Sequence, residues 1–220
     1  KSKLYLSFAL LALIIVSLGT YVLVQTNVIE EKLDVIINHQ LPSIFLSTTL
    51  DTELAELRNW QFHHITSHDS DTRNEAERNL SSLVKTINQN VEKYMQYVDN
   101  DLEQQSFKAF RQAWEQYLAV HDQTISASRN GDIMTAVDLI TGASTKEYAA
   151  LSDALTDMVE YNLAATAKMG AQANSLYRQI RVVLIGVTVL SLVVAAAISF
   201  LTIRSIIRPI SETTNILRHI

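Results

Sequence analysis

The stretch VVLIGVTVLSLVVAAAISFLTI, from Val182 to Ile203, holds 22 residues without a charge. A second run, LYLSFALLALIIVSLGTYVLV, covers 21 residues from Leu4 to Val24. At about 1.5 Å rise per residue, each would form a helix roughly 31–33 Å long, enough to cross a hydrocarbon core of about 30 Å. Because the section between the runs is polar and periodic, the sequence predicts a membrane protein with two transmembrane helices.

The first run has an alternative interpretation as a cleaved signal peptide, because Ser17 and Gly19 form a small-x-small pair that could serve as a cleavage site. The run continues to Val24 and is longer than the apolar part of a typical signal peptide. We therefore expect an uncleaved membrane anchor.

Cations predict the orientation of the chain. Lys1 and Lys3 precede the first run, and Arg204 and Arg208 follow the second. The positive-inside rule therefore predicts both ends in the cytoplasm and an outer domain between them, although two arginines just before the second run oppose the rule. The predicted organisation is a first transmembrane segment in 1–24, a periplasmic sensor domain in 25–181, a second transmembrane segment in 182–203 and a cytoplasmic segment in 204–220, in a bacterial inner membrane.

Composition restricts the outer domain. Residues 25–181 carry 13 Lys and Arg against 22 Asp and Glu, a net charge of −9, so neither nucleic acid nor anionic lipid is an expected ligand. The chain has 5 Gly, 2 Pro and no Cys, which favours helices held together by packing, without disulfides or thiolate metal sites.

The outer domain divides into four predicted helices, so the fold class is all-α. They cover about 25–68, 69–98, 101–129 and from 132 directly into the second run, with a possible kink at Pro42 and a possible irregularity at Thr141–Gly142. Short connections make successive helices antiparallel, which predicts an up-down-up-down four-helix bundle whose first and fourth helices continue into the transmembrane spans. The apolar stripes that support these helices include Leu33, Ile37, Leu41, Ile44, Leu50, Leu54 and Leu57 in the first and Leu102, Phe107, Phe110, Trp114, Tyr117, Leu118, His121 and Ile125 in the third.

Two motifs carry a family resemblance. The segment DLEQQSFKAFRQAWEQYL at 101–118, followed by RNGD at 129–132, resembles the third helix and turn of the four-helix-bundle ligand-binding domain of methyl-accepting chemotaxis proteins. Leu57-Arg58-Asn59 is similar to the segment that begins the ligand pocket of that family. The resemblance covers about 25–181 and implies a homodimer that binds a small molecule between the first helices of two subunits.

The sequence after the second run resembles the first helix of a HAMP linker domain. It contains Arg208-Pro209-Ile210, and the pairs Ile210 with Leu217 and Thr213 with Ile220 are each seven residues apart, a spacing that suits a parallel coiled coil. The alternative is an amphipathic helix lying on membrane lipid, but few cations flank it. We favour HAMP, and expect a cytoplasmic kinase and adaptor to be contacted by sequence beyond Ile220.

The resemblance and the chemistry of arginine point to one candidate ligand site. In aspartate and serine chemoreceptors, arginines hold the ligand carboxylate; Arg58 matches the first of these, whereas His63 and Ser67 stand at the positions of the other two. Guanidinium offers a planar fork for carboxylate, which favours a small organic anion, and the alternative is an ordinary salt bridge with Glu53 or Glu56 of a partner chain. The predicted ligand-binding residues are Arg58, Asn59, Phe62, His63, Ser144 and Thr145, of which the last two match the polar start of the fourth helix in that family.

Two other sets of residues were weighed as sites. Trp60 and Trp114 could line an apolar pocket, although a tryptophan in a bundle is more often part of the core. His64 and His68, one helical turn apart, could bind a metal together with His63 or His121. A pair of histidines without an H-E-x-x-H motif or cysteine is more often solvated or in the core, so no metal site is predicted.

No Ser-His-Asp arrangement, phosphate-binding glycine loop or closely paired acid in an apolar setting is present in the sequence, so neither an enzyme nor a cofactor is predicted. The leading hypothesis is a chemoreceptor sensor that passes a helix displacement to HAMP. The alternatives are the input module of a sensor histidine kinase or of a cyclic-nucleotide signalling enzyme, and a structural membrane coiled coil that binds no ligand.

Overall fold

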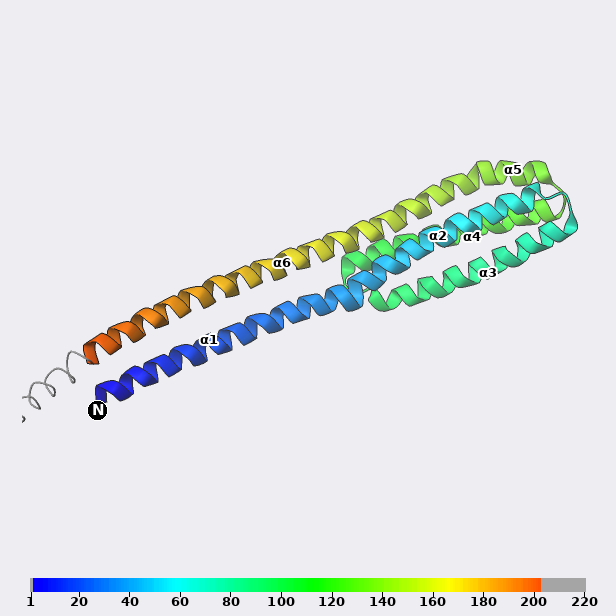
Figure 1. Ribbon diagram of the computed structural model, residues 1–220. Helices are drawn as coiled ribbons and strands as arrows, with labels where there is room; N and C mark the ends of the chain where they lie inside the picture. Colours follow the sequence, from blue (N-terminus) through cyan, green and yellow to red (C-terminus); the bar gives the residue numbers. More distant parts are fainter. Residues whose placement is uncertain (1, 203–220) are drawn as a thin grey trace, which may run out of the picture. The chain divides into compact units, whose positions relative to one another are not determined.

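The computed structural model describes residues 2–202, which form helices joined by short turns and contain no strand. The predicted all-α four-helix bundle is confirmed. The predicted HAMP-like segment, 204–220, lies outside the described residues. In chain order the elements are α1 (Ser2–Val35), a π-helical turn η1 (Ile36–Gln40), α2 (Leu41–Thr66), α3 (Ser70–Tyr94), a 3-10 turn η2 (Met95–Tyr97), α4 (Asp101–Arg129), α5 (Ile133–Thr141) and α6 (Ala143–Thr202), all shown in Figure 1.

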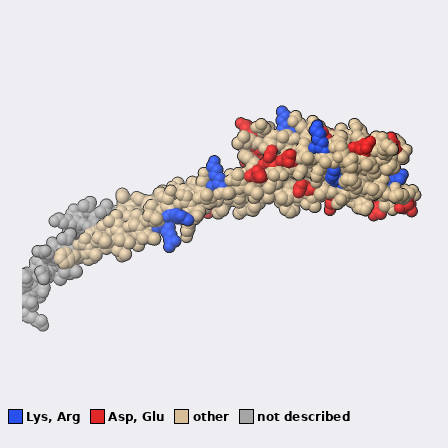
Figure 2. Space-filling model, turned by 90° about the horizontal axis from the view of Figure 1, so that it is seen from above, with Lys and Arg blue, Asp and Glu red and all other residues tan. Residues whose placement is uncertain are grey.

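Contacts divide the chain into two units, one of residues 34–169 and one of 1–33 with 170–220. The first unit is the helical bundle, and Figure 2 shows that acidic and basic side chains gather on it, whereas few lie on the apolar helical segments. Within the described residues, two helical stretches are long and apolar enough to cross a membrane, Ala12–Thr66 and Ile133–Phe200. The domain boundaries placed at residues 25 and 181 remain predictions.

Polar cap residues explain where three of the helices begin. In each case a side-chain oxygen accepts a hydrogen bond from the main-chain N–H three residues later, which satisfies a donor that has no partner inside the helix. The pairs are Asp69 with Thr72 at 2.8 Å for α3, Asn100 with Glu103 at 3.0 Å for α4, and Asp132 with Thr135 at 3.2 Å for α5.

The turn predicted at residues 129–132 ends α4 in a Schellman motif. Gly131 has φ +81°, a conformation that glycine adopts without a side-chain clash. Its N–H donates to the Ser128 carbonyl at 3.1 Å, and the Asp132 N–H donates to the Ala127 carbonyl at 3.0 Å. The chain then reverses directly into α5.

Pro42 produces a local change of helix type. Because proline has no N–H, it cannot donate to the carbonyl four residues earlier. The residues before it form the π-helical turn η1, in which the Leu41 N–H reaches back five residues to the Ile36 carbonyl. The first predicted helix therefore appears as α1, η1 and α2.

The buried face of η1 and α2 follows a strict alternation of three- and four-residue steps, which is the spacing of a helix packed in a bundle. Its middle is apolar, and both ends are polar. The members of this inner face are Gln40, Ser43, Ser47, Leu50, Leu54, Leu57, Gln61 and His64.

The core centres on the middle of the bundle. Trp114 is buried in this cluster, so its interpretation as a core residue is confirmed, and its indole N–H donates to Asn88 at 2.9 Å. Trp60 packs at the edge of the same cluster. Several side chains of the predicted stripes lie instead on the outside of the protein, namely Leu33, Ile37, Leu41 and Leu102.

The interruption between α5 and α6 gives a first test of the fold. A Cβ added at Gly142 would lie 2.8 Å from the main-chain oxygen of Asp138, whereas one added at Gly170 would meet nothing within 4 Å. Gly142→Ala should therefore destabilise the protein by about 1–3 kcal/mol through overpacking. Gly170→Ala is the matched control and should be neutral or stabilising by up to about 1 kcal/mol, because alanine favours helix. Urea unfolding of the chain in detergent, followed by circular dichroism, measures both; equal effects would contradict this account of the interruption.

Candidate functional site

Arg58 connects α2 to the junction of α5 and α6. Its guanidinium donates to Thr145 Oγ1 at 2.7 Å, to the main-chain oxygen of Ile140 at 3.4 Å and to Ser144 Oγ at 3.5 Å. The Ile140 oxygen also accepts from Thr145 Oγ1 at 2.9 Å. α5 ends at Thr141 and α6 begins at Ala143, and at this break the Ile140 oxygen accepts from side-chain donors, whereas the Gly142 N–H and carbonyl keep main-chain bonds to Asp138 and Lys146.

Two aromatic rings flank the Arg58 side chain. The guanidinium carbon lies 4.9 Å from the ring centre of Tyr148 on α6 and 5.5 Å from that of Phe62 on α2. These distances are typical of cation–π contacts. The pKa of Tyr148 is raised, mainly by burial and also by the charge of Asp51, so its phenol remains neutral. The rings hold the cation at the surface of the bundle without cancelling its charge.

The structure brings together four of the six predicted ligand-binding residues. Arg58, Phe62, Ser144 and Thr145 meet at the α5–α6 junction. Asn59 is exposed on α2, beside this group. His63 is also exposed, and the centre of its ring lies 5.3 Å from that of Trp60.

Within the described part of the chain, no carboxylate lies within ion-pair distance of the Arg58 guanidinium, and the salt bridge with Glu53 or Glu56 of a partner chain stays a prediction. Glu53 of the same chain accepts two hydrogen bonds from the Asn90 amide, at 2.8 and 2.9 Å. Among the described residues, Arg58 therefore has no anionic partner.

A buried chain of hydrogen bonds begins close to Arg58. The Tyr117 hydroxyl donates to Gln61 Oε1 at 2.8 Å, and Gln61 Nε2 lies 2.6 Å from His121 Nδ1. Burial raises the pKa of Tyr117 to about 12, and the charge of Arg58 and the hydroxyl of Ser144 oppose part of this shift because both lie near the phenol. The phenol therefore remains a donor at any physiological pH.

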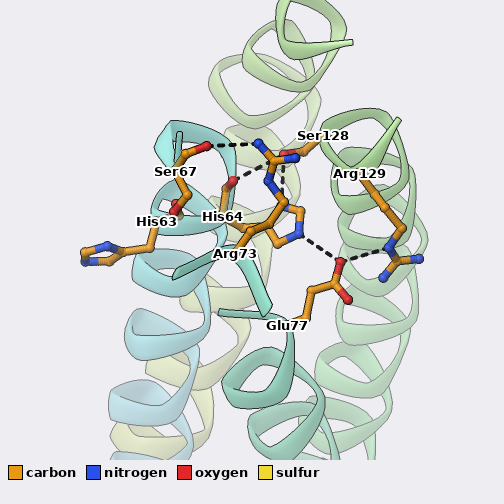
Figure 3. Close-up of polar contacts among 7 residues, drawn as sticks. All are labelled: His63, His64, Ser67, Arg73, Glu77, Ser128 and Arg129. Atoms are coloured by element: carbon orange, nitrogen blue, oxygen red, sulfur yellow. Dashed lines mark hydrogen bonds and ion pairs between the residues drawn. The ribbon is translucent and has the colours of Figure 1, made fainter. Parts of the chain in front are cut away.

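The sequence interpretation missed a polar cluster at the end of the bundle where α2 turns into α3. Figure 3 shows His64 between Ser128 on α4 and Glu77 on α3, with Arg129 also paired to Glu77. His64 Nδ1 lies 2.9 Å from Ser128 Oγ, and its Nε2 lies 3.1 Å from Glu77 Oε1. Its side chain is fully buried, whereas His68 is exposed, so the two do not form the paired histidine face considered from the sequence. The signal that could have found His64 is its place in the three-and-four spacing of the inner face.

Three surface grooves lie elsewhere on the bundle, one along α3, one along α4 and one between α4 and α5. Arg58 lines none of the three. Its site is an open face of α2 and α6, which a single chain does not enclose. A small molecule held at Arg58 would therefore need a second surface to cover it.

These features define a class of protein: an all-helical bundle with two helices that could span a membrane. The family model described as a four-helix bundle sensory module for signal transduction matches residues 1–177. The chain belongs to this family, the four-helix-bundle sensory module of chemoreceptors, which is a signalling input module. A search of curated proteins returned no match.

The contacts of Arg58 predict a local stabilising effect. Arg58→Ala removes three hydrogen bonds that bridge α2 and the α5–α6 junction, and we expect a loss of about 1–2 kcal/mol in local stability. Amide hydrogen exchange at Gly142 and Lys146 should then become about 5- to 30-fold faster. Arg78→Ala on the exposed face of α3 removes the same charge and is the matched control, with no change expected at these amides. Identical exchange in the two variants would mean that Arg58 does not stabilise the junction.

Proposed function

We propose that this chain is the sensor module of a transmembrane chemoreceptor that binds a small organic anion at Arg58 and passes the signal along α6. One observation carries the proposal: among the described residues, the guanidinium that bridges α2 and the α5–α6 junction has neutral hydrogen-bond partners only, Thr145, Ser144 and the Ile140 carbonyl. Guanidinium carries five N–H donors, so donors remain for a ligand carboxylate. An anion would also balance a charge that has no counter-ion among the described residues.

Ligand binding at Arg58 would act on the start of α6. A carboxylate that attracts the guanidinium competes with its bonds to Ile140 and Thr145, and these bonds tie α2 to the α5–α6 junction. α6 then continues as a single helix from Ala143 to Thr202. A shift of about 1–2 Å in such a helix is within the known range of allosteric switches. In the proposed receptor, this shift passes through the second transmembrane segment to the HAMP domain and on to a cytoplasmic kinase and adaptor.

A second regular face of α2 supports a homodimer. Exposed side chains recur at steps of three and four residues along the helix, which is the spacing of a left-handed coiled-coil contact. The apolar members at its two ends leave 50%, 69% and 39% of their surface exposed, for Leu41, Phe45 and Phe62 respectively. The complete outer face is Leu41, Phe45, Thr48, Thr52, Ala55, Asn59 and Phe62.

The dimer and the ligand site support each other. Asn59 and Phe62 belong to the outer face, and Arg58 adjoins Asn59 in the sequence, so a partner subunit packed on this face would cover the open side of the Arg58 site. We place this domain in the periplasm and the spans in the bacterial inner membrane, on the cation distribution of the sequence.

The ligand proposal is tested by titration calorimetry with a panel of small mono- and dicarboxylates. For any that bind, Arg58→Ala should weaken the affinity by about 10- to 150-fold, which corresponds to about 1.5–3 kcal/mol for a charge-assisted bidentate contact. Arg58→Lys should restore only part of it, because an ammonium lacks the planar fork. Unchanged affinity in a folded Arg58→Ala protein would place the ligand elsewhere.

The dimer proposal is tested by disulfide cross-linking, for which the absence of native cysteine is convenient. Phe45→Cys and Thr52→Cys lie on the outer face and should give cross-linked dimers in membranes under mild oxidation. Gln89→Cys, exposed on α3, is the control and should remain monomeric. If the α2 variants cross-link no better than this control, a parallel dimer through α2 is wrong.

A further inference from the structure

His64 is a fully buried titratable group that the ligand mechanism does not use. Its two ring nitrogens have different partners, the Ser128 hydroxyl at 2.9 Å and the Glu77 carboxylate at 3.1 Å. An ionised carboxylate only accepts hydrogen bonds, so the Nε2 that faces Glu77 carries a proton. The neutral and the charged forms of the ring therefore differ in whether Nδ1 carries a proton.

The surroundings of Nδ1 satisfy both protonation states of the ring. Ser128 Oγ lies near Nδ1 and also 3.4 Å from the main-chain oxygen of His64. In the neutral ring the serine hydroxyl donates to Nδ1. In the charged ring Nδ1–H donates to the serine oxygen, and the hydroxyl turns to the His64 carbonyl. A proton can therefore enter without leaving a buried polar group unpaired, which would otherwise cost about 1–3 kcal/mol.

The route to solvent runs through Glu77. The Glu77 side chain is 31% exposed and that of its other partner, Arg129, is 59% exposed, whereas His64 is inaccessible. In Figure 3 the carboxylate lies between the imidazole and the arginine, at the edge of the bundle. Hydrogen bonds from Arg129 and then from His64 hold the pKa of Glu77 below its ordinary value of 4.5. The carboxylate thus stays ionised over the range in which imidazoles titrate.

We propose that His64 is a proton-binding site, and that the module senses external acidity through it in addition to its ligand. Uptake of a proton converts the His64–Glu77 contact into a buried ion pair that joins α2 to α3. The proposal rests on the proposed function in one respect: the proton must be that of the compartment outside the membrane.

The charged groups around His64 favour this single protonation. Glu77 on α3 attracts the charge, and Arg129 on α4 and Arg73 on α3 oppose it; Arg73 donates to the Ser67 carbonyl at 2.9 Å. α5 meets this end of α2 through Ala136 and Ile140, while its one acid, Asp138, and its N-cap, Asp132, are exposed. On α2 itself, the other charged or titratable neighbours are the exposed His63 and His68.

His121 on α4 is the second buried histidine. Its surroundings favour the neutral ring, whereas those of His64 favour the charged ring. Burial, followed by the charge of His64, lowers its pKa from the ordinary 6.5, while Asp122 acts to raise it. Its Nδ1 accepts from the Gln61 amide, which suits the neutral ring. The stability from a lowered histidine pKa is complete above about pH 6.5 and is lost as the pH falls, because the unfolded chain takes up the proton first. Melting curves alone therefore mix two opposite effects.

The proton site and the Arg58 site are connected through the core. His121 senses the charge on His64, and Gln61 links His121 to Tyr117, whose phenol lies near Arg58 and Ser144. A charge on His64 disfavours proton uptake by His121. The neutral His121 ring then continues to accept from Gln61, and Gln61 continues to accept from Tyr117, so the direction of these hydrogen bonds is kept. The two inputs would thus meet at one buried hydrogen-bonded chain.

The test is nitrogen NMR of the whole chain in detergent micelles, labelled at its 6 histidines. The spectra distinguish singly from doubly protonated rings, and His64→Gln and His121→Gln assign the two buried ones. On acidification, His64 should become doubly protonated while His121 is still singly protonated, because burial lowers the pKa of His121. Glu77→Gln should lower the ratio of charged to neutral His64 at a given pH by about tenfold or more, since an opposite charge within a few ångströms supports the charged form.

Glu75→Gln is the matched control, because Glu75 is exposed on the same helix and its replacement changes the charge equally. It should leave the His64 ratio within about twofold of the original. A His64 ring that stays singly protonated while His121 becomes doubly protonated, or equal effects of the two glutamine variants, would overturn the proposal. The measurement needs no ligand, so its result stands apart from the outcome of the Arg58 titrations.

Discussion

The break between α5 and α6 leaves the Ile140 main-chain oxygen to be satisfied by side-chain donors. The need for these donors determines how the residues around the break are arranged. The Ile140 oxygen receives donors from two side chains, Thr145 of the following helix and Arg58 of α2. Arg58 thereby becomes a structural bridge as well as the cation of the site. The same bonds would hold the start of α6 in one position until something competes for the guanidinium.

α2 has two regular faces that differ in what they contact. The inner face, with members such as Leu57 and Gln61, packs within the bundle, and the outer face, with Asn59 and Phe62, is exposed. Both follow three- and four-residue steps, so the helix suits packing on two sides. Arg58 lies between Leu57 and Asn59, at the boundary of the two faces. A change in the packing of one face at this residue would therefore also change the packing of the other face.

Much of the architecture could be predicted from the sequence because local chemistry specifies it. Cap residues such as Asn100 and the glycine of the Asn130-Gly131 turn determine helix ends within one or two residues, and α4 begins and ends where expected. The prediction was weaker for Leu33, Ile37 and Leu41, which were grouped with core leucines although they face outward. Periodicity shows that a helix has an apolar side; it does not say whether that side meets its own bundle or another surface.

The site was predicted only in part, for a related reason. Resemblance to a family identified Arg58 and the start of the last helix, and the structure brings these residues together. It could not show that the arginine already has neutral partners in its own chain, because these bonds depend on the interruption at Gly142. For His64 the sequence left open whether the ring is solvated or in the core, because the stripe of the first helix was drawn from apolar side chains alone.

The polar ends of the inner face have an energetic meaning. A leucine at the position of Gln61 or His64 would bury more apolar surface and avoid the cost of desolvating polar atoms. The bundle instead holds an amide and an imidazole there, each paired by hydrogen bonds that depend on the relative positions of α2, α3 and α4. Such bonds are directional, so small displacements between these helices change their energy far more than they change apolar contact. A sensor must respond to small displacements, and a bundle with an apolar middle and hydrogen-bonded ends combines a stable fold with a sensitive region beside the start of α6.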